Sequence, residues 1–328
     1  MHLALFFTGV LWMLAAHAIG IRAADGILDR LGWSTGQALL SHAFFLFLLL
    51  LGFTALSWIG LRQGSLRQAN ALPRRATALR EWSVGASVGW AALLLAVLPM
   101  MLVGALHPQF LWSAPAWGAS ALSILALAVA ALANEVAFRG FVFRRLIDSV
   151  GPTAATLVLS LLYAVLGSLR PNATGLSFFI TLIAGILFSL AYLRTRALWL
   201  GWGLHFAWAA SMAILFGLPA GGVATYSVVI QTGTTGPDWF TGGAYGPEGG
   251  LFTIAAFFFA MFLLYKATRE FAWDYTHEPI VPGGYPMDVP PPAAHTAMEQ
   301  QSRPPALVQI NPAPSSIADD SPPDGPEA

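Results

Sequence analysis

The chain has 328 residues, of which 56% are hydrophobic and only 10% charged, and its formal net charge is zero. A soluble globular domain carries about 25% charged residues, so this composition excludes a water-soluble globule and predicts a membrane protein. The zero net charge provides no basic field for nucleic acid, and the absence of cysteine excludes disulfides and thiolate metal sites.

Apolar runs of about 17–25 residues, each long enough to cross the hydrocarbon core of a bilayer, recur along the chain. They predict an all-α fold, a polytopic membrane bundle of about eight transmembrane helices. The first run follows only Met1 and His2, without Lys or Arg, which favours a retained helix over a cleaved signal peptide. The runs lie at residues 3–21, 38–60, 83–105, 118–138, 153–169, 176–193, 197–216 and 250–266.

The basic residues alternate between the two sides of these predicted spans. The side opposite the basic loops has only Arg22, Arg30 and Arg170. Because cytoplasmic loops carry the excess of Lys and Arg, we expect both termini in the cytoplasm. The loops after spans two, four, six and eight hold Arg62, Arg67, Arg74, Arg75, Arg80, Arg139, Arg144, Arg145, Arg194, Arg196, Lys266, Arg269 and Arg303.

Composition divides the chain into four predicted parts. Residues 1–116 hold three helices and a basic cytoplasmic loop, and residues 117–217 hold core helices four to seven. Residues 218–276 hold an external Gly-rich loop and helix eight. Residues 277–328 are rich in Pro and poor in large apolar residues, which predicts a disordered cytoplasmic tail.

Glu135 is the one acid well inside an apolar span. A charge in hydrocarbon costs a few kcal/mol, so it faces the bundle interior and finds a partner. Arg139 lies four residues on, on the same helical face, and the small residues Ala131 and Ala128 on that face allow a close neighbouring helix. The pair is either a structural lock or part of a chemical site. Asn134 lies about 100° round the helix.

Three histidines fall in or at the spans. His17 and His42 lie near span ends without a nearby acid, and interfacial packing is the better interpretation of both. His205 enters from the same side as Glu135 at a comparable depth, so the two could share a water-filled pocket. The alternative for His205 is a packed, hydrogen-bonded residue.

The sequence lacks the usual hydrolase motifs H-E-x-x-H and G-x-S-x-G. The stretch NEVAFRGFVFRRL resembles the first motif, E-E-x-x-x-R, of the CPBP (CAAX-protease and bacteriocin-processing, Abi) intramembrane metalloproteases. YLRTRALWLGWGLHFAWAA resembles their third motif, H-x-x-x-N, and SLLYAVLGSLRPNATG is a degenerate form of the second, F-x-x-x-H. The resemblance covers about residues 118–217 and implies an intramembrane endopeptidase fold.

Residue by residue, the resemblance is incomplete. Glu135, Arg139 and His205 match motif positions and are the candidate catalytic residues, with Glu135 as surviving base and His205 as oxyanion stabiliser. Asn134 replaces the first glutamate of motif one, and Ala209 replaces the asparagine of motif three. In motif two, Tyr163 stands at the aromatic position and Gly167 replaces the histidine. In the family the first glutamate and that histidine are thought to activate water. The resemblance therefore implies reduced or lost hydrolysis.

Two alternatives to a protease remain. The chain could bind hydrophobic peptides or partner membrane proteins without hydrolysis, as a pseudoenzyme. It could also be a small-solute transporter, which a single intramembrane acid and the lack of paired broken helices do not favour.

We expect no cofactor, because one Glu and one His make a poor zinc set. The expected partners are the lipid bilayer and a membrane-associated or hydrophobic peptide or protein, but no nucleic acid. The expected location is the bacterial inner membrane. Gly85 and Gly89 form a G-x-x-x-G that weakly indicates dimerisation.

Overall fold

The computed structural model describes residues 1–32, 36–62 and 65–269. These residues lie in one compact unit. The predicted disordered tail, and Arg303 within it, lie outside the described residues. The larger helices are α1 (His2–Leu31), α2 (Gln37–Leu61), α4 (Ala78–Leu102), α5 (Ala114–Glu135), α6 (Phe141–Val150), α7 (Pro152–Gly167), α8 (Gly175–Thr195), α9 (Trp199–Ala210) and α11 (Phe252–Ala267).

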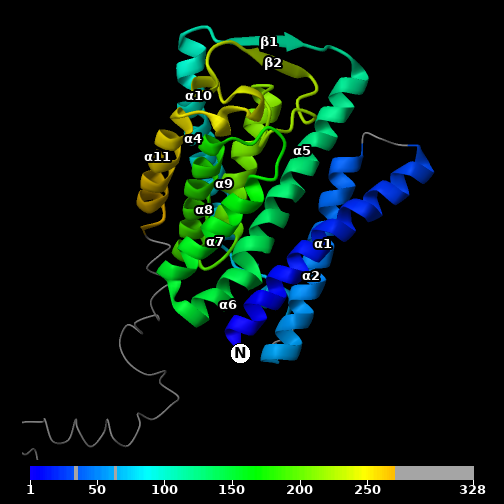
Figure 1. Ribbon diagram of the computed structural model, residues 1–328, viewed down its shortest axis with the longest axis vertical. Helices are drawn as coiled ribbons and strands as arrows, with labels where there is room; N and C mark the ends of the chain where they lie inside the picture. The colour runs from blue at the N-terminus through cyan, green and yellow to red at the C-terminus, as the bar shows by residue number, and fades with distance from the viewer. Residues whose placement is uncertain (33–35, 63–64, 270–328) are drawn as a thin grey trace, which may run out of the picture. The chain divides into compact units, whose positions relative to one another are not determined.

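The described residues form a bundle of helices (Figure 1), and the long apolar helices among them are those of an integral membrane protein. Five apolar segments are long enough to cross a bilayer, namely His2–Leu31, Gln37–Leu61, Ala78–Leu102, Ala114–Val150 and Gly175–Thr195. Helices α7 and α11 are apolar but shorter. Helices therefore form at all eight predicted places, while length and composition support five of them as spans.

The helix ends follow local capping chemistry. Helix α5 begins after Ser113, whose side chain accepts a hydrogen bond from the Ala116 amide. Helix α8 begins with a capping box between Thr174 and Ser177, and it ends at Arg196, which adopts a left-handed conformation. The following turn leads directly into α9, so two site-bearing helices are joined by a short, well-defined connection.

Two π-helical turns interrupt the expected regular helices. The first, η1 (Val136–Gly140), separates α5 from α6, and the second, η2 (Ser211–Leu215), extends α9. The sequence predicted that the fourth span ends near residue 138. The chain instead stays helical to Val150. π-turns shift the register of side chains and are common at functional sites. The two turns beside Glu135 and Ala209 therefore indicate a functional site near these residues.

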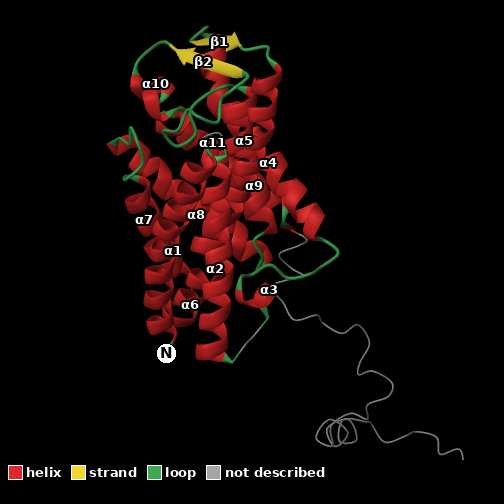
Figure 2. Ribbon diagram, turned by 90° about the vertical axis from the view of Figure 1, so that its right-hand side faces the viewer, coloured by secondary structure: helices red, strands yellow, loops and turns green. Residues whose placement is uncertain are grey.

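The predicted loop between Gly217 and Gly250 is folded. Its strand β2 (Ile230–Thr234) pairs antiparallel with β1 (Leu106–Phe110), from Leu106 opposite Thr234 to Phe110 opposite Ile230. This small sheet lies at one end of the helices and the N-terminus at the other (Figure 2). The remaining short elements are α3 (Leu66–Ala69), α10 (Asp238–Thr241), η3 (Gly243–Tyr245) and η4 (Pro247–Gly249).

Glycines allow α4 and α9 to pack with their backbones in contact. A side chain at Gly85 would overlap the Leu200 carbonyl oxygen, one at Gly89 the Leu204 carbonyl oxygen, and one at Gly203 the Trp82 carbonyl oxygen. The G-x-x-x-G motif therefore packs inside one chain, which corrects its interpretation as a dimerisation face. This close approach fixes the position of α9 and thus of His205.

Polar contacts join the loops that follow the predicted spans two, four, six and eight. These loops therefore lie at the same end of the bundle, as the alternation of basic residues predicts. The contacts are Arg144 to the Gln68 carbonyl, Arg75 Nη2 to the Thr195 carbonyl at 2.9 Å, and Arg194 Nε to Thr268 Oγ1 at 2.9 Å.

Candidate functional site

Glu135, the last residue of α5, points into the bundle as predicted, with 1% of its surface exposed. Its Oε1 lies 3.0 Å from Nδ1 of His205 on α9. A carboxylate only accepts, so Nδ1 carries the hydrogen and donates it. The two residues are therefore joined by a direct hydrogen bond, where the sequence predicted only a shared pocket.

Gly201 makes room for this hydrogen bond. It lies one turn before His205 on the same face of α9, and a Cβ there would come within 2.9 Å of Glu135 Oε2. The ring of His205 stacks on Phe188 of α8, with centroids 4.6 Å apart. Contacts with α5 and α8 thus fix the imidazole that α9 carries, and Nε2 is the ring nitrogen that is not bonded to Glu135.

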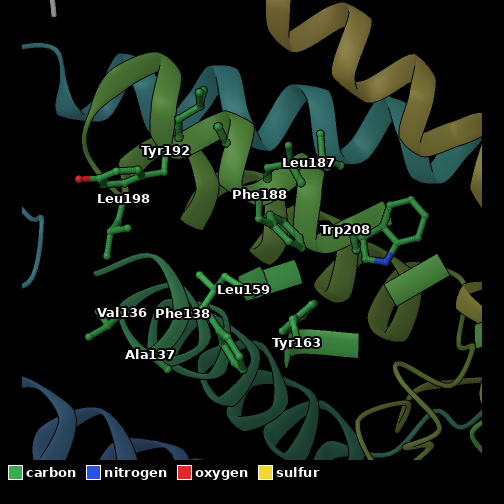
Figure 3. Close-up of a cluster of buried hydrophobic side chains, with 14 of the residues drawn as sticks. Val136, Ala137, Phe138, Leu159, Tyr163, Leu187, Phe188, Tyr192, Leu198 and Trp208 are labelled. Atoms are coloured by element: carbon green, nitrogen blue, oxygen red, sulfur yellow. The ribbon is translucent and has the colours of Figure 1, made fainter. Parts of the chain in front are cut away.

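Arg139 lies near Glu135 but does not hydrogen-bond to it. Its Nη1 is 3.9 Å from Glu135 Oε1, while its Nη2 donates to the Gly185 carbonyl at 3.2 Å. The guanidinium is fully buried, and its carbon lies 4.7 Å from the ring centroid of Tyr163 and 5.2 Å from that of Phe188. Figure 3 shows both rings in the buried cluster around α8. Cation–π contacts with these rings therefore hold Arg139 in addition to the carboxylate.

A cavity of about 210 Å³ lies beside this pair. His205 lines it and Glu135 does not, so the carboxylate acts on the cavity through the imidazole. Two of the replaced motif positions also line it. Its polar lining residues are His42, Asn134, Arg170, His205, Tyr226 and Glu248, and Ala209 is among its small ones.

A second cavity, of about 370 Å³, adjoins α1, α2, α5 and α7. Its apolar lining residues are Met13, Leu14, Phe45, Phe138, Leu166 and Leu169, and its other lining residues are His17, His42, Asn134, Tyr163, Gly167 and Arg170. An apolar lining of this kind suits a hydrophobic chain.

The three replaced motif positions, Asn134, Gly167 and Ala209, line the two cavities. Asn134 is half-buried, and its amide donates to the Ala130 carbonyl at 2.9 Å, which leaves its oxygen for the cavity. Gly167 offers no side chain, and a Cβ there would come within 2.9 Å of Thr181. Ala209 has no polar atom. None of the three supplies a proton acceptor of useful strength.

The sequence missed the contribution of the loop after η2. Glu248 lines the first cavity, and its Oε1 accepts a hydrogen bond from Trp208 Nε1 at 2.7 Å. Burial alone would lower the pKa of Arg170, but the nearby Tyr163, Tyr245 and Glu248 raise that pKa above its ordinary value. In the sequence, Arg170 is the one basic residue between predicted spans five and six. This isolated charge was the signal from which a buried partner such as Glu248 could have been sought.

His17 and His42 differ from each other in the structure. His17 is exposed and packs edge-to-face on Phe45, with ring centroids 5.1 Å apart, which fits the expected packing role. His42 is half-buried and lines both cavities. The interpretation of His42 as an interfacial packing residue is therefore incomplete.

The side chains at this site do not fit a catalytic metal. Within residues 1–32, 36–62 and 65–269, no three His, Cys, Asp or Glu side chains gather in a way that would hold a metal ion. Glu135 Oε1 is already bonded to His205, and catalytic zinc takes three protein ligands. We therefore derive no step through a metal.

The central segment matches a known protein family. Residues 115–211 match the model of the family described as type II CAAX prenyl endopeptidase Rce1-like. The match runs from the start of α5 to the start of η2 and confirms the predicted resemblance to CAAX proteases for this part of the chain. No curated protein and no solved structure matches the chain.

Proposed function

We propose that this chain is a slow intramembrane endopeptidase of the CAAX-protease type, which cleaves hydrophobic, membrane-associated peptides. The observation that carries the proposal is the hydrogen bond from His205 to the buried carboxylate of Glu135, beside a polar cavity. A carboxylate on one imidazole nitrogen orients the ring and stabilises its charged form, as in other hydrolytic sites. The family match over residues 115–211 supports the reaction class.

The roles follow from the contacts. His205, held by Glu135, faces the cavity and stabilises negative charge on the carbonyl oxygen of a scissile peptide. Glu135 positions His205 and balances its charge rather than touching substrate, because it does not line the cavity. Arg139 holds the π-turn below Glu135 through Gly185 and the aromatic rings. The apolar lining residues of the second cavity contact the hydrophobic part of the substrate.

The replaced motif positions explain why the reaction is slow. Losing a general base costs about 10²–10⁴ in rate, and losing an oxyanion donor costs about 10²–10³. Asn134, Gly167 and Ala209 lack these groups. Activity at the level of an intact family member is therefore not expected.

These same positions favour a second candidate function, a membrane protein that binds hydrophobic peptides or partner proteins without cleaving them. Both candidates use the same cavities and the same helices. They differ only in whether a peptide bond breaks.

In either case we propose a multi-pass protein of the bacterial inner membrane with both termini in the cytoplasm. The contacts that gather the basic loops at one end support this orientation. Cysteine accessibility at residues near Arg67 and near Gln231 on intact cells tests it.

New protein N-termini, compared among membranes of cells that carry the wild type, no copy, or Glu135→Gln, separate the two candidates. A fourth strain carries Asn134→Glu, Gly167→His and Ala209→Asn together. Products that depend on the wild type and disappear with Glu135→Gln support the endopeptidase. Products from the fourth strain alone favour the binding protein.

A further inference from the structure

The two cavities share three lining residues, His42, Asn134 and Arg170. The larger cavity is lined mainly by apolar residues and the smaller has more polar ones, so these three residues lie where the two cavities adjoin. A hydrophobic peptide in the larger cavity would bring its polar backbone to this place. A water activator therefore has to be sought among these three residues first.

Only one of the three can take a proton from water. An amide such as that of Asn134 is not a base, and the guanidinium of Arg170 is already protonated. His42 carries an imidazole, the side chain most often used as a general base.

The structure fixes the tautomer of His42. Its Nδ1 lies 2.6 Å from the Ala38 carbonyl oxygen, one turn earlier on α2. A carbonyl only accepts, so Nδ1 carries the hydrogen, and Nε2 of the neutral ring is an unprotonated acceptor. The backbone hydrogen bond thus prepares Nε2 to receive a proton.

The other histidines and the carboxylate at the cavities have other places or roles. Of the two cavities His205 lines only the smaller, and in the proposed function its ring, held by Glu135, stabilises the oxyanion instead of accepting a proton from water. Glu248 accepts from Trp208 Nε1 and holds the external loop against α9. His17 is exposed and lines only the larger cavity. Among the described histidines, His42 alone combines a position on both cavities with a ring nitrogen prepared to accept a proton.

We propose that His42, on α2 and outside the matched segment, is the general base of this site. Its Nε2 takes a proton from a water molecule as the water oxygen bonds to the scissile carbonyl carbon. The C–N bond then breaks, and the proton passes from Nε2 to the leaving amine. His205 stabilises the oxyanion meanwhile. This inference rests on the proposed function and adds a residue that no family motif contains.

The test uses His42→Asn in the full-length protein in cell membranes. Asn can still donate to the Ala38 carbonyl, as Asn134 does to Ala130, but it cannot accept the proton. We expect products to accumulate at least 10²-fold more slowly at an unchanged level of folded protein. His107→Asn is the matched control, because His107 lies on β1 outside both cavities.

A second variant separates chemistry from structure. His42→Gly opens space beside the cavity, and added imidazole should restore part of its cleavage while leaving Glu135→Gln inactive. Cleavage at the wild-type rate by folded His42→Asn would overturn the role of His42 and leave the proposed function standing. The absence of products from the wild type would overturn both.

Discussion

Two buried glutamates of this protein lie near arginines, and they do different things. Glu81, in the first turn of α4, is fully buried, and its Oε1 lies 3.1 Å from Arg75 Nε and accepts from Thr77 Oγ1 at 2.9 Å. Glu135 is equally buried, but Arg139 is 3.9 Å away and turned toward aromatic rings.

The surroundings of the two carboxylates explain the difference. Arg75 also donates to the Thr195 carbonyl, so the Glu81 cluster ties the loop before α4 to the end of α8. Neither Glu81 nor Arg75 lines the cavities beside His205. Glu135 is bonded instead to an imidazole that faces a cavity. A buried Glu–Arg pair is thus a structural feature by default, and an adjoining histidine and cavity make it a candidate site.

The largest expected effect concerns stability. Glu81→Gln removes the carboxylate charge that lies 3.1 Å from Arg75 Nε in a mostly buried place and should cost about 3 kcal/mol of folding free energy. Glu135→Gln should cost much less, because Arg139 keeps Gly185 and the rings and His205 can still donate to the amide oxygen. Thermal unfolding of both variants in detergent micelles checks this, and equal losses of Tm would contradict the distinction.

Gly201→Ala should damage the site without damaging the fold. The added Cβ would displace Glu135 Oε2 and, through it, His205, and a misplacement of about 1 Å costs roughly 10²-fold in rate. We expect product accumulation to fall by that factor while Tm hardly changes. Gly118→Ala, on the same helix as Glu135 with nothing within 4 Å of the new atom, is the control and should change neither quantity.

Arg139→Lys keeps the charge but not the planar group. A lysine ammonium cannot both reach the Gly185 carbonyl and lie flat on the rings of Tyr163 and Phe188. We expect a loss of about 1–2 kcal/mol, measured as the shift of the unfolding midpoint. A variant as stable as the wild type would mean that the rings contribute little.

The smallest expected effect is a pH dependence of stability in the loop between η2 and α11, which contains Tyr245. Burial, and next the carboxylate of Glu248, raises the pKa of Tyr245 above its ordinary value. The folded loop therefore favours the neutral phenol, so its stability is full below about pH 10 and falls as the pH rises through the folded pKa. Tyr245→Phe should lose less stability than the wild type between pH 9 and pH 11.

Tyr265→Phe, at an exposed position on α11, is the control for the pH series. Its Tm should fall with pH as that of the wild type does. If the Tm values of Tyr245→Phe and Tyr265→Phe fall equally with pH, Tyr245 does not cause the loss of stability at alkaline pH.

Much of this arrangement could be predicted from local chemistry. The apolar runs place the helices, and the single intramembrane acid identifies Glu135, because burial of an unpaired charge is costly. The roles of Glu81 and His42 could not be predicted from their local contacts. Arg75, the partner of Glu81, also donates to the distant Thr195 carbonyl, and His42 lines a cavity together with residues of α5 and α9. The π-turns after Glu135 and Ala210, and the docking of Glu248 on Trp208, also depend on tertiary packing.

In the proposed function Glu135 and His205 form a hydrolytic pair, whereas Glu81 has a structural role. The most direct test is the rate of product formation per folded molecule in membranes that carry wild type, Glu135→Gln, His205→Ala or Glu81→Gln. We expect Glu135→Gln and His205→Ala to lose the products. We expect Glu81→Gln to lower their amount only in proportion to the amount of folded protein. Products from His205→Ala at the wild-type rate per folded molecule would contradict the hydrolytic role of the pair.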